Sequence, residues 1–245
     1  MSDETPTVVL VHGAFADGSS WNGVIQRLHV KGVNVIAPAN PLRGIAIDSA
    51  YTASVFAQTP GPVLAVGHSY GGAVITNAAT EAKNVIGLVY VAAFAPEEGE
   101  LLGDASAASK DSILGTALVP RQYPTPSGGT AVEFTVDPAR IHDVFAADLP
   151  DELTPLVAAT QRPVAELAFS EPNGAPAWKD LPSWAVVALS DKAAGTDVVR
   201  SMAEWAGATI TEVEGSHVIM ISQPDAVTDV IMNALAAVEA PAPVG

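Results

Sequence analysis

The stretch Gly67–Gly71, which reads Gly-His-Ser-Tyr-Gly, constrains the fold of this chain more than any other. An apolar, β-branched run, Val63–Val66, precedes it, and a helical pattern begins near Gly72. A serine between such flanks is typical of a sharp strand-to-helix turn, in which the glycines avoid collisions with the neighbouring strand and helix. The turn would hold the Ser69 hydroxyl above the end of the strand, beside the N-terminus of the helix. A plain turn rich in Gly and Ser is the alternative, and the surrounding chain has to decide between the two.

Further short apolar runs have the length and the β-branched composition of buried strands, and they alternate with helical patterns. These runs are Thr7–Val11, Val33–Ala37, Val85–Ala92, Ser183–Leu189 and Ala208–Val213. Alternating strands and helices with short links predict an α/β fold, with a mostly parallel sheet of about six strands and helices on both faces. The chain has 245 residues, of which 49% are hydrophobic, so it can bury the core that such a sheet needs.

The alternation stops after Phe94 and resumes near residue 182. The intervening residues 95–181 contain many prolines and only weak helical patterns. Alternating apolar residues at Val132–Val136 predict one short strand, and the Gly- and Pro-rich stretch Pro120–Gly129 reads as a loop. We therefore expect a core made of residues 1–94 and 182–245, with a mainly helical lid, residues 95–181, inserted between two core strands.

Three candidate catalytic side chains each follow the carboxyl end of a predicted strand: Ser69, Asp191 and His217. In open parallel sheets, ligands bind outside these strand ends, so the three should meet at one edge of the sheet. A serine hydroxyl is a poor nucleophile until a base takes its proton, and the base needs a group that fixes its tautomer. The chain order serine, aspartate, histidine is the one expected for a hydrolase with this turn. The pattern predicts Ser69 as nucleophile, His217 as general base and Asp191 as its partner.

Backbone N–H groups of Tyr70 and Ala14 are the expected oxyanion hole, with Phe15 as the other possible donor from the loop after the first strand. Other carboxylates could take the role of Asp191, namely Asp197, Glu97 and Glu98. His12 and His68 flank the site, and we expect them to support it through hydrogen bonds. Five aromatic residues could line a substrate pocket or be lid core: Phe94, Phe134, Phe145, Phe169 and Trp178.

Together these motifs resemble the α/β-hydrolase superfamily. The resemblance rests on His12–Phe15, on Gly67–Gly72, and on Gly215–His217 followed by Ser222–Pro224. The most similar subgroup holds small bacterial esterase-like hydrolases, plant methyl-ester esterases and hydroxynitrile lyases. Two departures stand out: the superfamily's usual N-terminal antiparallel strands are not expected here, and the loop Asp191–Gly195 lacks the proline that often follows the acidic residue.

The resemblance implies a serine hydrolase that cleaves a carboxylic ester or lactone of a small to medium hydrophobic substrate through an acyl-enzyme, without a cofactor. A carbon–carbon bond hydrolase uses the same three side chains and is one alternative. A hydroxynitrile-lyase-like enzyme is another, although Val218 stands where related lyases carry a lysine. A catalytically idle ligand-binding protein is the third.

The amino-acid composition limits the kinds of molecule that the protein can bind. The net charge of −16 argues against nucleic acid and anionic membranes, because both require basic patches. The absence of cysteine excludes disulfides and a thiolate nucleophile, and the five scattered histidines offer no metal-binding set. No apolar run approaches the ~20 residues that span a bilayer, and Met1–Pro6 lacks the features of a signal peptide. We expect a cytoplasmic monomer or homodimer that acts on a small molecule.

Overall fold

A six-stranded sheet forms the centre of the computed structural model, which describes residues 5–239. The strand order is β2-β1-β3-β4-β8-β9, and every pairing within this sheet is parallel. The strands are β1 (Thr7–Val11), β2 (Asn34–Ile36), β3 (Val63–His68), β4 (Val85–Val91), β8 (Ser183–Ala188) and β9 (Thr209–Val213). The predicted parallel sheet is confirmed, and the described residues contain no antiparallel strand before β1.

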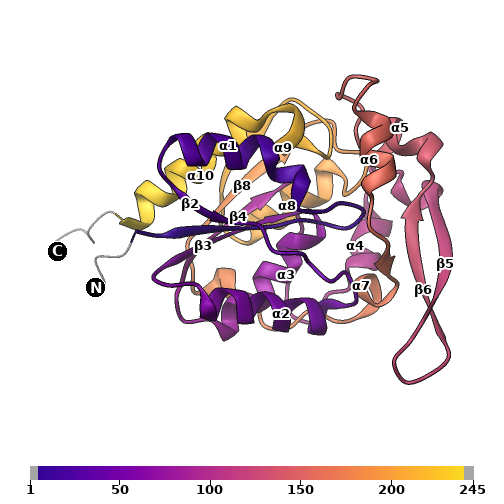
Figure 1. The fold of residues 1–245 in the computed structure, drawn as a ribbon, viewed down its shortest axis with the longest axis horizontal. Helices are drawn as coiled ribbons and strands as arrows, with labels where there is room; N and C mark the ends of the chain where they lie inside the picture. The colour runs from indigo at the N-terminus through magenta and orange to yellow at the C-terminus, as the bar shows by residue number, and fades with distance from the viewer. Residues whose placement is uncertain (1–4, 240–245) are drawn as a thin grey trace.

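Helices cover both faces of this sheet (Figure 1). One face carries α1 (Asn22–Val30), α9 (Ile219–Ser222) and α10 (Pro224–Glu239); the other carries α2 (Ile45–Gln58) and α3 (Tyr70–Ala78). A further helix, α8 (Thr196–Trp205), joins β8 to β9. Because both faces are covered, every residue of β1 and β3 is buried, which explains their continuous apolar runs. Each buried Val or Leu contributes about 1.5–3 kcal/mol to stability.

Residues 95–181, the predicted lid, lie between β4 and β8 in the chain and extend beyond the six-stranded sheet in Figure 1. Their regular elements are α4 (Leu102–Ala108), β5 (Leu118–Pro124), β6 (Thr130–Val136), α5 (Ile141–Val144), α6 (Thr154–Thr160), β7 (Val164–Ala165) and α7 (Leu167–Ser170). Short 3₁₀ helices complete the described chain: η1 (Gly18–Trp21), η2 (Ala79–Glu81), η3 (Leu114–Ala117), η4 (Pro138–Arg140) and η5 (Ala177–Lys179).

The expectation of a single short strand in the lid is wrong. A three-stranded antiparallel sheet, in the order β5-β6-β7, occupies this region. The prolines that suggested a loop, Pro120 and Pro124, lie in β5, which pairs only with β6. An edge strand tolerates the missing proline N–H groups on its unpaired side. Gly128 and Gly129, with φ of +84° and +92°, then turn the chain into β6.

The division of the chain into core and lid stays a prediction, and its residues 1–4 and 240–245 lie outside the described part. No helix among residues 5–239 combines the length and the apolar character needed to cross a membrane.

Candidate active site

Ser69 occupies a strained elbow between β3 and α3, with φ of +53° and ψ of −124°. The glycines around it are required by close backbone approaches. A Cβ on Gly67 would lie 2.5 Å from the carbonyl oxygen of Gly71, and a Cβ on Gly71 would lie 2.4 Å from that of Val11. A Cβ on Gly13 would lie 2.6 Å from the Cβ of Ser69. The elbow therefore presses the β1 loop against the serine, and any side chain at these glycines would push the two apart.

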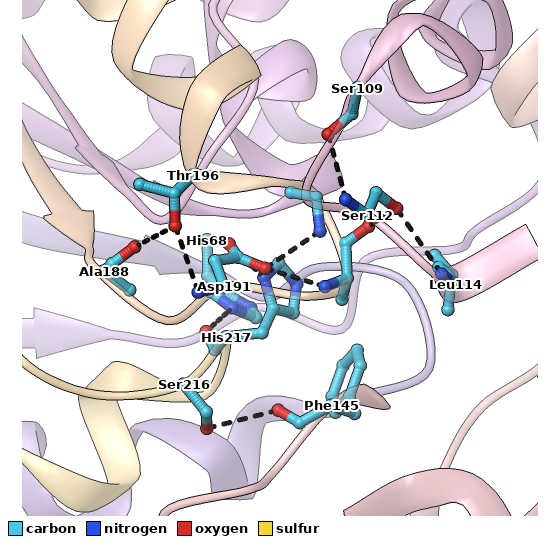
Figure 2. A network of polar contacts seen from close by, with 12 residues as sticks. His68, Ser109, Ser112, Leu114, Phe145, Ala188, Asp191, Thr196, Ser216 and His217 are labelled. Atoms are coloured by element: carbon cyan, nitrogen blue, oxygen red, sulfur yellow. Dashed lines mark hydrogen bonds and ion pairs between the residues drawn. The ribbon is translucent and has the colours of Figure 1, made fainter. Parts of the chain in front are cut away.

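His217 and Asp191 are hydrogen-bonded, although 26 residues separate them in the chain. The distance from His217 Nδ1 to Asp191 Oδ2 is 2.8 Å, and both side chains are buried (Figure 2). The other carboxylate oxygen, Oδ1, accepts from the backbone N–H groups of Ala193 (2.9 Å) and Ala194 (3.0 Å). A carboxylate only accepts, so His217 carries its hydrogen on Nδ1 and leaves Nε2 free to take a proton.

The acid loop keeps its shape without the usual proline because Thr196 braces it. The backbone N–H of Asp191 donates to Thr196 Oγ1 (3.1 Å), and that hydroxyl donates to the carbonyl of Ala188 (2.7 Å; Figure 2). These contacts fix the first turn after β8, and with it the direction of the Asp191 carboxylate.

The competing carboxylates lie elsewhere. Asp197 accepts from the hydroxyl of Ser109 (2.6 Å) and from the backbone of the lid. Glu97 pairs with Lys179 and accepts from the indole N–H of Trp205. Glu98 is exposed on the loop that follows β4, where its own backbone N–H donates to Glu97. Among the three candidates and Asp191, the structure brings only Asp191 to His217.

Ser69 and His217 line the same small enclosed hollow, which we call the Ser69 cavity. Its cavity volume is about 10 Å³, which is room for about one water molecule. Within the described chain, no hydrogen bond joins the Ser69 hydroxyl to the imidazole. Such contacts often tighten only when substrate binds. The lining residues are Ala14, Phe15, Ser69, Tyr70, Phe94, Ser106, Leu114, Phe145, Phe169, Ala194 and His217.

All three candidate oxyanion-hole residues line this cavity. The backbone N–H groups of Tyr70, Ala14 and Phe15 have no hydrogen-bond acceptor among the described residues. Tyr70 is the first residue of α3, so its N–H also lies at the positive end of a helix dipole. Phe15 has a φ of +60°, a left-handed conformation that is uncommon for a residue other than glycine. Unpaired amides at a cavity wall can stabilise an oxygen that becomes negative.

His12 and His68 are buried supports of the site. His68 Nε2–H donates to the backbone carbonyl of His217 (2.9 Å), and burial lowers the pKa of His68 well below its usual value. His12 Nδ1–H donates to the carbonyl of Gly13 (2.9 Å), while its Nε2 accepts from the N–H of Asn40 (3.0 Å). Burial also lowers the pKa of His12. Both rings are therefore neutral, and they brace the β1 loop and the backbone of His217 without adding positive charge.

Sequence reasoning missed a further support, Asp48. Its fully buried carboxylate accepts from the hydroxyl of Tyr70 (2.7 Å) and from the backbone N–H of Arg43 (3.0 Å). Burial raises the pKa of Asp48, and the hydrogen bonds oppose that rise. The contact anchors the side chain of the residue that follows Ser69. An acidic residue in the first turn of a largely apolar helical segment was the signal available in the sequence.

Four of the aromatic candidates line one of two hollows, and Phe169 lines both. Phe94, Phe145 and Phe169 line the Ser69 cavity. The ring centroids of Phe145 and His217 lie 4.9 Å apart. Phe134 lines a second hollow in the lid, beside α4, η3 and α7, which we call the lid groove. Trp178 lines neither of the two, and its indole N–H donates to the carbonyl of Pro96 (3.2 Å). No three His, Asp or Glu side chains within residues 5–239 gather into a metal-binding set.

Comparison with known proteins agrees with this architecture. The sequence matches the profile of the alpha/beta hydrolase family over residues 8–230. The chain therefore belongs to the alpha/beta hydrolase family. It is 26% identical over 249 aligned positions to a pyrethroid hydrolase of Sphingobium wenxiniae, covering 92% of this chain and 86% of that protein.

Two further similarities are more limited. A carbendazim hydrolyzing esterase of Nocardioides is 34% identical over 114 aligned positions, which cover 38% of this chain and 44% of that protein. The crystal structure of polyneuridine aldehyde esterase superposes with a TM-score of 0.79 at 20% identity, covering 94% of this chain and 99% of the other. This last likeness concerns the fold alone.

Proposed function

We propose that the protein is a serine hydrolase that cleaves carboxylic esters or lactones through an acyl-enzyme. The observation that carries the proposal is the shared cavity of Ser69 and His217. Asp191 fixes the imidazole, and three of the residues that line the cavity have backbone N–H groups without an acceptor among the described residues. Of the proteins with similar sequences, one is named an esterase and another a pyrethroid hydrolase, which supports ester cleavage.

In the first half-reaction, the oxygen of Ser69 attacks the ester carbonyl carbon while His217 Nε2 takes the hydroxyl proton. The carbonyl oxygen becomes negative and accepts hydrogen bonds from the backbone N–H of Tyr70 and from that of Ala14 or Phe15. The bond to the alcohol oxygen then breaks, and that oxygen receives the proton from His217. The acyl group remains on Ser69, and Asp191 stabilises the imidazolium while it exists.

In the second half-reaction, water attacks the acyl carbon and gives a proton to His217. The bond between the acyl carbon and Ser69 breaks, the serine oxygen recovers the proton from His217, and the carboxylic acid leaves. The phenyl rings around the cavity exclude competing water and favour a small to medium hydrophobic substrate.

The arrangement of the site opposes two of the alternatives. Val218, directly after His217, is buried and apolar, so it supplies no ammonium group of the kind found in related hydroxynitrile lyases. An idle binding protein would have no need of the strain at Ser69 or of unpaired amides at the cavity wall. A carbon–carbon bond hydrolase would use the same side chains and differ in its substrate.

The test is Ser69→Ala, assayed with p-nitrophenyl acetate and with a fluorophosphonate probe. The variant should lose on the order of 10⁶-fold in kcat, as expected when such a catalytic unit loses its nucleophile, and should not be labelled. Ser201→Ala, at an exposed serine of α8, is the matched control and should retain both activity and labelling. Turnover by the Ser69 variant near the wild-type rate would refute the proposal, and release of cyanide from mandelonitrile would favour the lyase.

A further inference from the structure

The lid groove is a much larger hollow than the Ser69 cavity. The volume of the lid groove is about 520 Å³, and that of the Ser69 cavity is about 10 Å³. Three residues line both hollows: Ser106, Leu114 and Phe169. These shared residues come from three different elements, α4, η3 and α7, and they form the partition between the groove and the candidate nucleophile.

We propose that the lid groove binds the remote apolar part of the ester substrate, and that the side chains of Leu114 and Phe169 form a gate between the groove and Ser69. The inference rests on the proposed ester hydrolysis and names where the substrate extends and what it carries. A cavity with room for about one water holds little more than the reacting carboxyl group. The rest of any larger ester has to leave the cavity, and the neighbouring hollow across the partition accommodates it.

The lid segment before Leu114 is tied to the acid loop, so this wall stays in place as a unit. The hydroxyl of Ser112 donates to the carbonyl of Ala193 (2.6 Å), and that of Ser109 donates to the carboxylate of Asp197 (2.6 Å). Figure 2 shows this segment running beside the pair formed by Asp191 and His217. Swinging the segment away would break these contacts next to the catalytic acid.

The lid is also held at its sheet. The backbone N–H of Ala165 in β7 donates to the carbonyl of Leu42 (2.9 Å), and Arg43 pairs with Glu133 of β6 (2.7 Å). Opening the whole lid would break the contacts at both places together. Rotation of one or two side chains breaks none of them and occurs on a faster timescale. The gate therefore opens by rotation of side chains and not by movement of the lid backbone.

The charge of the lid groove selects among esters. Asp104 and Glu166 line it, and neither forms an ion pair within the described residues. No lysine, arginine or histidine is among the lining residues. A carboxylate on the remote part of a substrate would meet two like charges in a partly apolar hollow, which is unfavourable. The groove should take neutral esters and reject those that carry a second, anionic group.

The first test fills the groove. A Cβ on Gly115 would meet no atom within 4 Å, so the larger side chain of Gly115→Leu can take up part of the groove without strain at the backbone. We expect kcat/KM for p-nitrophenyl hexanoate to fall about tenfold relative to that for the acetate ester. Leu156→Ala, at an exposed lid leucine outside the groove, should leave this ratio unchanged. An unchanged ratio in Gly115→Leu would overturn the groove as the binding site.

The second test widens the gate. Leu114→Ala and Phe169→Ala should each raise the ratio of hexanoate to acetate kcat/KM about tenfold, because the smaller side chains leave a wider opening between the groove and the Ser69 cavity. Phe134→Ala, which enlarges the groove but not the partition, should raise KM for the hexanoate ester and so lower the ratio of hexanoate to acetate kcat/KM. Ratios within about twofold of the wild type in both gate variants would overturn the gate.

The third test uses the mono-p-nitrophenyl ester of adipic acid. This substrate matches p-nitrophenyl hexanoate except that a carboxylate replaces the terminal methyl group. The wild type should prefer the hexanoate ester, and the double variant Asp104→Asn, Glu166→Gln should reduce this preference about tenfold. An unaltered preference would overturn the charge selection. Failure of the wild type to hydrolyse the acetate ester would instead refute the proposed function, so the two outcomes are distinguishable.

Discussion

Replacing Asp191 by asparagine should place the proton of His217 on the wrong nitrogen. Two backbone N–H groups, those of Ala193 and Ala194, donate to Oδ1 of Asp191, and His217 Nδ1 contacts Oδ2. In Asp191→Asn, the amide oxygen has to face the two backbone donors, so the NH₂ group faces His217 Nδ1. The imidazole then has to accept at Nδ1 and carry its hydrogen on Nε2, the nitrogen needed as the base.

The expected loss is about 10⁴-fold in kcat, which is about 5.4 kcal/mol of activation free energy. Because asparagine has nearly the same shape as aspartate, the fold should remain. Steady-state rates with p-nitrophenyl acetate measure the loss, and ¹⁵N NMR of the histidine ring reports which nitrogen carries the hydrogen.

The matched control is Asp225→Asn, at an exposed aspartate that pairs with Arg27. An exposed ion pair contributes at most about 1 kcal/mol, so this variant should keep its rate and its histidine tautomer. A wild-type rate in Asp191→Asn, or an unchanged ring hydrogen on Nδ1, would refute the tautomer argument and move the catalytic acid to another carboxylate.

Three further outcomes follow from the buried residues around the elbow. Burial lowers the pKa values of His12 and His68 below 6.5, so the unfolded chain binds more protons than the folded one in this pH range. The free energy of unfolding should therefore fall below pH 6.5, by up to about 1.4 kcal/mol per pH unit for each ring. Urea titrations between about pH 7.5 and about pH 5.5 measure this fall. Gly13→Ala would place a Cβ 2.6 Å from the side chain of the candidate nucleophile, and should cost about 1–3 kcal/mol in a thermal melt together with most of the esterase activity. Tyr70→Phe removes the hydroxyl that donates to the buried Asp48, and should destabilise the fold by about 1.5–3 kcal/mol in the same melt.

Matched substitutions control two of these outcomes. Gly115→Ala introduces a Cβ into open space and should be neutral, and Tyr51→Phe alters a tyrosine that is 41% exposed. Equal effects of the Gly13 and Gly115 variants, or of the Tyr70 and Tyr51 variants, would contradict the packing argument. A flat stability profile between about pH 5.5 and about pH 7.5 would contradict the assignment of neutral buried histidines.

The six-stranded sheet and the elbow could be predicted because local patterns specify them. Short β-branched runs between turns indicate buried strands, and the glycines on both sides of Ser69 mark a turn in which the backbone passes within 2.6 Å of where a Cβ would lie. The positions of Asp191 and His217 after consecutive strands of the core were enough to bring them to one sheet edge, because parallel strands end together.

The lid sheet could not be predicted from the same patterns. Two prolines in Leu118–Pro124 argue against a strand, and only the position of β5 at the sheet edge makes them acceptable. The pairing of Asp48 with Tyr70 joins residues 22 apart in the chain on two packed helices, so it depends on the tertiary fold. The place of Trp178, away from both hollows, likewise follows from how the lid folds back on the loop after β4.

The central claim is that Ser69 carries the acyl group during turnover. Intact-mass spectrometry of enzyme quenched early in the reaction with p-nitrophenyl hexanoate, followed by peptide mapping, tests this directly. We expect one acyl group per chain, attached to Ser69, and none in Ser69→Ala. Turnover with the acyl group on another residue, or sustained hydrolysis by Ser69→Ala without a covalent intermediate, would contradict the account.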